Sequence, residues 1–236
     1  MGMEIDAARV RWVAFDADDT LWVNEPFFFE AERALEVLLA PFTEEQEGDF
    51  RDALYRREMA NLKLFGYGAK GFTLSMIETA IELSNSKISA GEIQEIIDLG
   101  KKVMHIPIEL LEEVEVTVKA LSVKYPLMVI TKGDLFDQEG KLARSGLGAL
   151  FSDVEIVSEK NVDTYRQICE RYDREPGEGL MVGNSLKSDI LPALDAGMQA
   201  AHIPHEVTWI HEQVTPPADA EYATLSRIGE LARILL

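Results

Sequence analysis

A short apolar run that ends in three carboxylates is the feature of this sequence that most restricts its fold. Val13 to Phe15 are apolar, and Asp16, Asp18 and Asp19 follow within four positions. An apolar run of this kind is typical of a buried strand, whose end would lie at the carboxyl edge of a sheet, where open α/β folds bind ligands. Carboxylates crowded there repel one another unless a cation, a proton or water relieves the repulsion. The alternative is a polar turn with exposed acids.

The composition favours a large core and argues against nucleic-acid binding. The chain has 236 residues, enough for one large or two modest domains, and 47% of them are hydrophobic. A formal net charge of -19 would repel a phosphate backbone, so we expect no nucleic-acid partner. No apolar stretch approaches the ~20 residues of a membrane span, and no targeting segment is visible. We therefore expect a cytoplasmic protein without a membrane partner; the sequence leaves its oligomeric state open.

The block after the first strand predicts four amphipathic helices that pack as a small bundle. We expect Asn24 to cap the first helix and Pro41 to end it. A capping box of Thr43 and Gln46 precedes the second helix, the glycines of residues 66–71 precede the third, and a capping box of Ser89 and Glu92 precedes the fourth.

From about residue 127, short apolar runs alternate with helical patterns, as βα units do. The first expected strand is residues 11–16, and the later ones are 127–131, 154–157, 180–182, 199–203 and an edge strand at 220–223. The helices expected between and after them include 186–196 and 225–236. This order predicts an α/β fold with a doubly wound parallel sheet. We expect residues 1–22 and 116–236 to form the core domain, and residues 23–115 to form an inserted helical domain.

Polar residues follow four of the expected strands, and parallel strands bring such residues to one edge of the sheet. In chain order they are Asp16 with Asp18, Thr131 with Lys132 and Gly133, Lys160, and Asn184 with Asp189. Carboxylates, an amide, a hydroxyl, a lysine and backbone N–H groups freed by glycine suit Mg²⁺ and a phosphoryl group. Thr131 alone could be an ordinary hydroxyl at a strand end, and Lys132 or Lys187 could serve the phosphate in place of Lys160.

The chain resembles the phosphatase branch of the haloacid dehalogenase superfamily. The family's Asp-x-Asp-x-Thr motif is matched by residues 16–20, its Thr or Ser by Thr131, and its lysine by Lys160. Its acidic motif, usually Gly-Asp-Ser-x-x-x-Asp, reads Gly-Asn-Ser-Leu-Lys-Ser-Asp at 183–189. The resemblance covers the whole chain and implies a Rossmann-like core. The helical insert matches the cap domain that many members carry.

The resemblance also implies roles for individual residues. Asp16 would be the nucleophile that forms an aspartyl-phosphate, and Asp18 the general acid and base. Thr131 and the amides of Lys132 and Gly133 would hold phosphoryl oxygens, while Lys160 would neutralise charge. The Mg²⁺ ligands would be drawn from Asp16, the Asp18 carbonyl, Asn184 and Asp189. Asn184 departs from the family's usual aspartate, which puts the strength of metal binding in question.

The leading hypothesis is a Mg²⁺-dependent phosphomonoester hydrolase with a small phosphorylated substrate. A phosphomutase of the same fold and a weakly active binding or regulatory homologue are alternatives. A receiver domain uses similar groups but carries no large helical insert, and dehalogenases generally lack the second aspartate, here Asp18. In the glycine loop at 66–71, Tyr67 and Lys70 could contact the substrate, or the loop could be a solvent-exposed turn.

Overall fold

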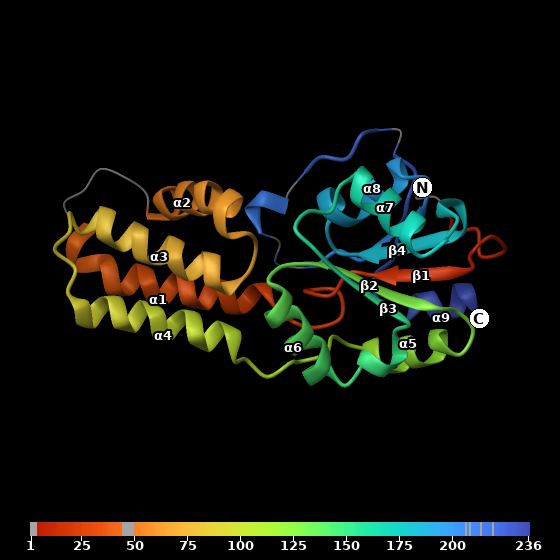
Figure 1. The fold of residues 1–236 in the computed structure, drawn as a ribbon, viewed down its shortest axis with the longest axis horizontal. Helices are drawn as coiled ribbons and strands as arrows, with labels where there is room; N and C mark the ends of the chain where they lie inside the picture. Colours follow the sequence, from red (N-terminus) through yellow and green to blue (C-terminus); the bar gives the residue numbers. More distant parts are fainter. Residues whose placement is uncertain (1–3, 44–49, 206, 208, 213, 219) are drawn as a thin grey trace. The chain divides into compact units, whose positions relative to one another are not determined.

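The computed structural model describes residues 4–43, 50–205, 207, 209–212, 214–218 and 220–236. The chain divides into two compact units (Figure 1). The first unit consists of Met1–Glu25, Ile108–Lys132 and Gln138–Leu236, and the second of Pro26–Pro107 and Gly133–Asp137. None of the helices in the described part of the chain has the length and apolar character needed to cross a membrane.

The first unit is built on a six-stranded parallel sheet, which confirms the α/β fold predicted from the sequence. The strands are β1 (Trp12–Phe15), β2 (Leu127–Lys132), β3 (Asp153–Val157), β4 (Gly179–Gly183), β5 (Gln199–His202) and β6 (Ala223–Thr224). Their order is β3-β2-β1-β4-β5-β6, and every neighbouring pair is parallel. Because β1 lies between β2 and β4, the residues that follow these three strands meet at one edge.

Alternate residues of the central strands pack against helices on opposite faces of the sheet (Figure 1). One face, which includes Val13 and Val129, packs against α5 (Val114–Ser122) and α9 (Glu230–Leu235). The other face, which includes Ala14 and Met128, packs against α7 (Val162–Arg171) and α8 (Leu191–Asp195). Burial of both faces explains why the strands are continuous apolar runs.

The second unit contains four long helices around their own apolar core. They are α1 (Glu25–Thr43), α2 (Phe50–Phe65), α3 (Ala69–Leu83) and α4 (Ala90–Met104). Leu35 and Leu39 of α1, Met76 of α3 and Ile96 of α4 are fully buried in this core. The predicted capping box at the start of α4 is confirmed, with Ser89 and Glu92 each accepting a backbone N–H of the other. The predicted box at Thr43 and Gln46 falls partly outside the described residues.

Several predicted elements differ in detail from the observed ones. Pro41 does not stop α1, which continues to Thr43; residue 41 has no N–H to donate to the carbonyl oxygen four residues earlier, so the proline removes one helical hydrogen bond without ending the helix. The expected helix at 186–196 is confirmed to within one residue, but its first part, Leu186–Ile190, is a π-helical turn that continues as α8. The edge strand β6 ends one residue later than expected, and the closing helix α9 is shorter than the expected 225–236.

Candidate active site

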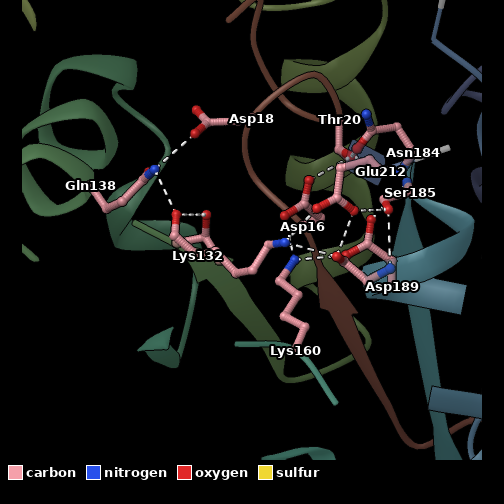
Figure 2. Close-up of polar contacts among 12 residues, drawn as sticks. Asp16, Asp18, Thr20, Lys132, Gln138, Lys160, Asn184, Ser185, Asp189 and Glu212 are labelled. Carbon is pink, nitrogen blue, oxygen red and sulfur yellow. Dashed lines mark hydrogen bonds and ion pairs between the residues drawn. The ribbon is translucent and has the colours of Figure 1, made fainter. Parts of the chain in front are cut away.

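The carboxylate of Asp16 lies just beyond the end of β1 and is held by residues from other parts of the first unit (Figure 2). Lys160 donates from its Nζ atom to Asp16 Oδ1 and to Asp189 Oδ1, the latter at 2.7 Å. The Thr20 hydroxyl lies 3.2 Å from Asp16 Oδ2. The structure thus brings together three predicted site residues from three separate segments of the chain.

These three ionisable groups are nearly excluded from water, and their charges do not balance. The exposed fractions are 8% for Asp16, 4% for Lys160 and 1% for Asp189. Burial and the charge of Asp189 raise the pKa of Asp16 to about 7, although Lys160 acts in the opposite direction. Burial disfavours the charged ammonium of Lys160, but the two carboxylates outweigh burial and raise its pKa. One lysine therefore faces two carboxylates in a poorly solvated site.

The position of Asp189 depends on the backbone that follows β4. Asp189 Oδ2 accepts the backbone N–H of Ser185 at 2.9 Å, so both carboxylate oxygens have protein partners. A Cβ atom at Gly183 would lie 2.3 Å from Asp189 Oδ2, which explains the need for glycine at the strand end. The π-helical turn Leu186–Ile190 carries Asp189 back toward the sheet. Such turns often occur at functional sites.

Asn184 is joined to Asp16 through the hydroxyl of Thr20. Asn184 donates its backbone N–H to Thr20 Oγ1 at 3.1 Å, and its Oδ1 atom lies 3.1 Å from the same hydroxyl. The main-chain oxygen of Asn184 lies 3.0 Å from His202 Nε2. The side-chain oxygen of Asn184 is therefore held on the same side of the site as the Asp16 carboxylate (Figure 2).

At the end of β2, the three residues predicted to hold phosphate lie in different surroundings. Thr131 is buried, with its hydroxyl 3.4 Å from the carbonyl oxygen of Lys132. Gly133 has a φ of +136°, which favours glycine. The Lys132 ammonium donates to Glu212 Oε1 at 2.6 Å and to the Ser188 hydroxyl at 2.8 Å.

Glu212 is a site residue that the sequence reasoning missed. Its Oε2 atom accepts hydrogen bonds from the hydroxyls of Ser185 and Ser188 at 2.5 and 2.6 Å. Burial alone would raise its pKa, but Lys132 and the two hydroxyls outweigh burial and lower the pKa to about 2. Glu212 comes from a segment after β5 that carries no recognisable motif, so only the fold could reveal it. The alternative phosphate lysines, Lys132 and Lys187, both contact residues of this segment.

Asp18 is held separately from Asp16, although both belong to the same motif (Figure 2). Its carboxylate accepts hydrogen bonds from Trp22, Gln138 and Lys141. The sequence reasoning missed Gln138 and Lys141 as site residues. The available signal was weak: two polar side chains three positions apart on α6 (Leu135–Ser145), the helix that follows Thr131.

Asp19 caps the chain segment that starts α1, in place of the predicted Asn24. Asp19 has a left-handed φ of +60°, and its carboxylate accepts the backbone N–H groups of Asn24 and Glu25 at 2.9 to 3.1 Å. Burial raises its pKa to about 6 against the effect of these hydrogen bonds. The Asn24 side chain instead accepts a hydrogen bond from Lys141 at 2.8 Å.

The glycine loop of the second unit places Lys70 beside an acid. Lys70 Nζ donates to Asp134 Oδ1 at 2.9 Å and lies 5.9 Å from the centroid of the Phe136 ring. The Lys70 side chain is 54% exposed, and Tyr67 is half-buried. The left-handed φ angles of Gly66 and Gly68, +73° and +112°, account for two of the three glycines of this loop.

The donor set around Asp16 suits a hard cation, although it is not a cluster of acids and histidines. Within the described residues, no group of three or more His, Cys, Asp or Glu side chains could hold a metal ion. The predicted ligands are instead two carboxylates, the Asn184 amide oxygen and the Asp18 carbonyl, all hard oxygen donors of the kind that Mg²⁺ accepts. Because Asp16 and Asp189 share one lysine, a cation beside them would also relieve their repulsion.

The chain is similar to known hydrolases. A family model described as haloacid dehalogenase-like hydrolase matches residues 10–197. The structure of a haloacid dehalogenase-like family hydrolase from Xanthomonas campestris is 36% identical in sequence, covers 98% of this chain and 93% of its own, and has a TM-score of 0.85.

Two curated relatives are also similar to the chain. A 5-amino-6-(5-phospho-D-ribitylamino)uracil phosphatase of Escherichia coli is 29% identical over 210 residues, which cover 83% of this chain and 84% of the relative. A glyceraldehyde 3-phosphate phosphatase of Methanothermobacter thermautotrophicus is 31% identical over 116 residues, which cover 47% of this chain. The chain spans about half the length of that second relative, 51%.

Replacing Asp16 with asparagine should stabilise the metal-free protein at neutral pH. The folded-state pKa of Asp16 is raised from 3.8 to about 7, so below pH 4 the carboxyl is neutral in both states and has no effect on stability. As the pH rises from 4 to 7, only the unfolded chain loses the proton, so the wild type loses stability. One pKa unit corresponds to ~1.4 kcal/mol, so the Asp16→Asn gain should reach a few kcal/mol above pH 7.

Urea unfolding at pH 5 and pH 8, with a chelator present, measures this effect. The gain from Asp16→Asn should be larger at pH 8, and the exposed control Asp195→Asn should show no such trend. A loss of stability in Asp16→Asn at pH 8 would mean that the ion pair with Lys160 outweighs the burial of the charge.

Proposed function

Because the chain belongs to the haloacid dehalogenase-like hydrolases, we propose that it is a Mg²⁺-dependent phosphomonoester hydrolase. Its substrate would be a small phosphorylated metabolite, and Asp16 would carry the phosphoryl group between the two steps. The two curated relatives, both named phosphatases, support this reaction class. The observation that carries the proposal is the contact of the buried Lys160 ammonium with two buried carboxylates, those of Asp16 and Asp189, which come from separate parts of the chain.

In the first step, a carboxylate oxygen of Asp16 attacks phosphorus and the bond to the leaving oxygen breaks. Asp18 gives its proton to that oxygen. Thr131 and the backbone N–H groups of Lys132 and Gly133 bind the phosphoryl oxygens. The Lys160 ammonium, already in contact with Asp16, offsets the negative charge that accumulates between carboxylate and phosphate.

In the second step, water attacks the phosphorus of the aspartyl-phosphate. Asp18, now a carboxylate, takes a proton from that water, and the bond between phosphorus and the Asp16 oxygen breaks. Inorganic phosphate leaves, and both aspartates return to their starting forms. The same two carboxylates therefore serve both steps without any other group changing its charge.

The residues that would hold Mg²⁺ are Asp16, the Asp18 carbonyl, Asn184 and Asp189. When bound, the ion supplies positive charge to the phosphate and lets an anionic substrate approach an anionic nucleophile. The two carboxylate oxygens of Asp189 already accept hydrogen bonds, one from Lys160 and one from the Ser185 amide. Asp189 would therefore contact the ion either directly or through a water molecule. The uncharged Asn184 amide would hold the ion less strongly than a carboxylate.

The proposal extends to the glycine loop, where Tyr67 and Lys70 would contact the part of the substrate beyond the phosphate. Lys70 already donates to Asp134, so an anionic group of the substrate would replace or share that partner. Lys70→Ala should raise the KM for the physiological substrate more than the KM for 4-nitrophenyl phosphate. Equal effects on both substrates would contradict a contact with the substrate.

Hydrolysis of 4-nitrophenyl phosphate with and without Mg²⁺ tests the proposed reaction. The wild type should release phosphate only with the metal, and Asp16→Asn should abolish turnover because its amide is not a nucleophile. The control Asp195→Asn removes an exposed carboxylate and should keep wild-type activity. Turnover by Asp16→Asn at the wild-type rate would show that Asp16 is not the nucleophile.

Restoring a carboxylate at Asn184 should tighten metal binding. Asn184→Asp adds one negative charge in a partly desolvated site, so the half-saturating Mg²⁺ concentration should fall by about tenfold, or ~1.4 kcal/mol. The control Asn85→Asp makes the same change on an exposed turn and should leave metal dependence unaltered. Unchanged metal dependence in Asn184→Asp would exclude Asn184 from the ligand set.

A further inference from the structure

Three side chains clamp the carboxylate of Asp18, and we refer to Trp22, Gln138 and Lys141 as the Asp18 clamp. Trp22 Nε1 donates to Oδ1 at 2.7 Å, and Gln138 Nε2 donates to Oδ2 at 2.8 Å. Lys141 Nζ contacts both oxygens, at 3.0 and 3.1 Å. Figure 2 shows Gln138 facing Asp18, apart from the group around Asp16. The clamp therefore leaves the Asp18 carboxylate little freedom to rotate.

Two members of the Asp18 clamp come from one face of α6, because residues three apart on a helix lie side by side. Both are buried, Gln138 at 4% and Lys141 at 7% exposure. Gln138 Nε2 also donates to the carbonyl oxygen of Lys132 at 3.0 Å, and Lys141 Nζ donates to Asn24 Oδ1 at 2.8 Å. The clamp thus joins α6 to the end of β2 and to the segment that follows Asp18.

The Asp18 clamp is a costly way to stabilise the fold. Burying an ion pair usually gains little over apolar side chains of similar size. In addition, Gln138 Oε1 is buried and has no hydrogen-bond partner among the residues that the structure describes. A buried acceptor without a partner costs stability, because the hydrogen bond that it made to water in the unfolded chain is not replaced. A role in placing Asp18 accounts for these residues better than stability does.

We propose that Lys141 and Gln138 are positioning residues for proton transfer by Asp18, an inference that rests on the proposed function. When the bond between phosphorus and the leaving oxygen breaks, the Asp18 proton moves to that oxygen and leaves a carboxylate. The Lys141 ammonium lies 3.0 Å from this carboxylate and stabilises its charge. Gln138 holds the second oxygen, so that the carboxylate faces the same direction when it takes a proton from water.

This role predicts a dependence on the leaving group. A 4-nitrophenolate departs without a proton, whereas an alkoxide departs only as it is protonated. The clamp therefore matters most for alkyl phosphates, which is the class that includes phosphorylated sugars and polyols. A purely structural role would lower the rate for all esters to the same extent.

A series of 4-nitrophenyl, phenyl and benzyl phosphates tests the proposal, with kcat/KM measured for the wild type and for Lys141→Met. The variant should lose on the order of 100-fold with benzyl phosphate, within the range of general acid catalysis, and less than about tenfold with 4-nitrophenyl phosphate. Lys141→Arg should recover part of the loss. The control Lys119→Met removes an exposed lysine paired with Glu115 and should leave the series unchanged.

Gln138→Leu provides a second variant if Lys141→Met does not fold. It should also lower kcat/KM more for benzyl phosphate than for 4-nitrophenyl phosphate. An equal loss with all three esters, or no loss with benzyl phosphate, would overturn the positioning role while leaving the proposed hydrolase intact. A wild type that hydrolyses none of the esters in the presence of Mg²⁺ would instead contradict the proposed function itself.

Discussion

The contact of one lysine with two buried carboxylates is the constraint on which the rest of the site depends. Lys160 holds Asp16 from the end of β1 and Asp189 from the turn after β4. This contact requires glycine at position 183, because a Cβ atom there would collide with the Asp189 carboxylate. It also requires the π-helical turn after β4, which returns Asp189 to the sheet. It also leaves a net negative charge away from water. The fold therefore keeps a destabilising negative charge at the position where a phosphoryl group and a cation would bind.

The two aspartates of one short motif have different surroundings because their carboxylates contact different parts of the first unit. Asp16 lies among Lys160, Thr20 and Asp189, whereas Asp18 lies against α6 (Figure 2). Separate environments would allow two identical side chains to take the different roles proposed for them, one as nucleophile and the other as proton carrier. Glu212 forms a further polar environment, in which Lys132 donates to a carboxylate oxygen of Glu212 and to the hydroxyl of Ser188.

The parallel sheet could be predicted because its strands are buried on both faces and read as continuous apolar runs. The convergence of Asp16, Lys160 and Asp189 followed from the rule that parallel strands end at one edge. Glu212, Gln138 and Lys141 could not be predicted, because they reach the site through tertiary folding and lie in segments without a motif. Asn24 was expected to cap α1, but a buried lysine attracts its side chain, and Asp19 binds the free amides instead. Such competition between partners is invisible in a linear sequence.

The central claim is that Asp16 forms a covalent bond to phosphorus, and trapping that bond tests it most directly. In Asp18→Asn, an activated ester such as 2,4-dinitrophenyl phosphate can still phosphorylate Asp16, but the water of the second step lacks its base. With Mg²⁺ present, a rapid acid quench and peptide mass spectrometry should find one phosphoryl group, on Asp16, together with a burst of dinitrophenolate. A phosphoryl group on another residue, or steady turnover of the ester without a burst or a labelled peptide, would contradict the account.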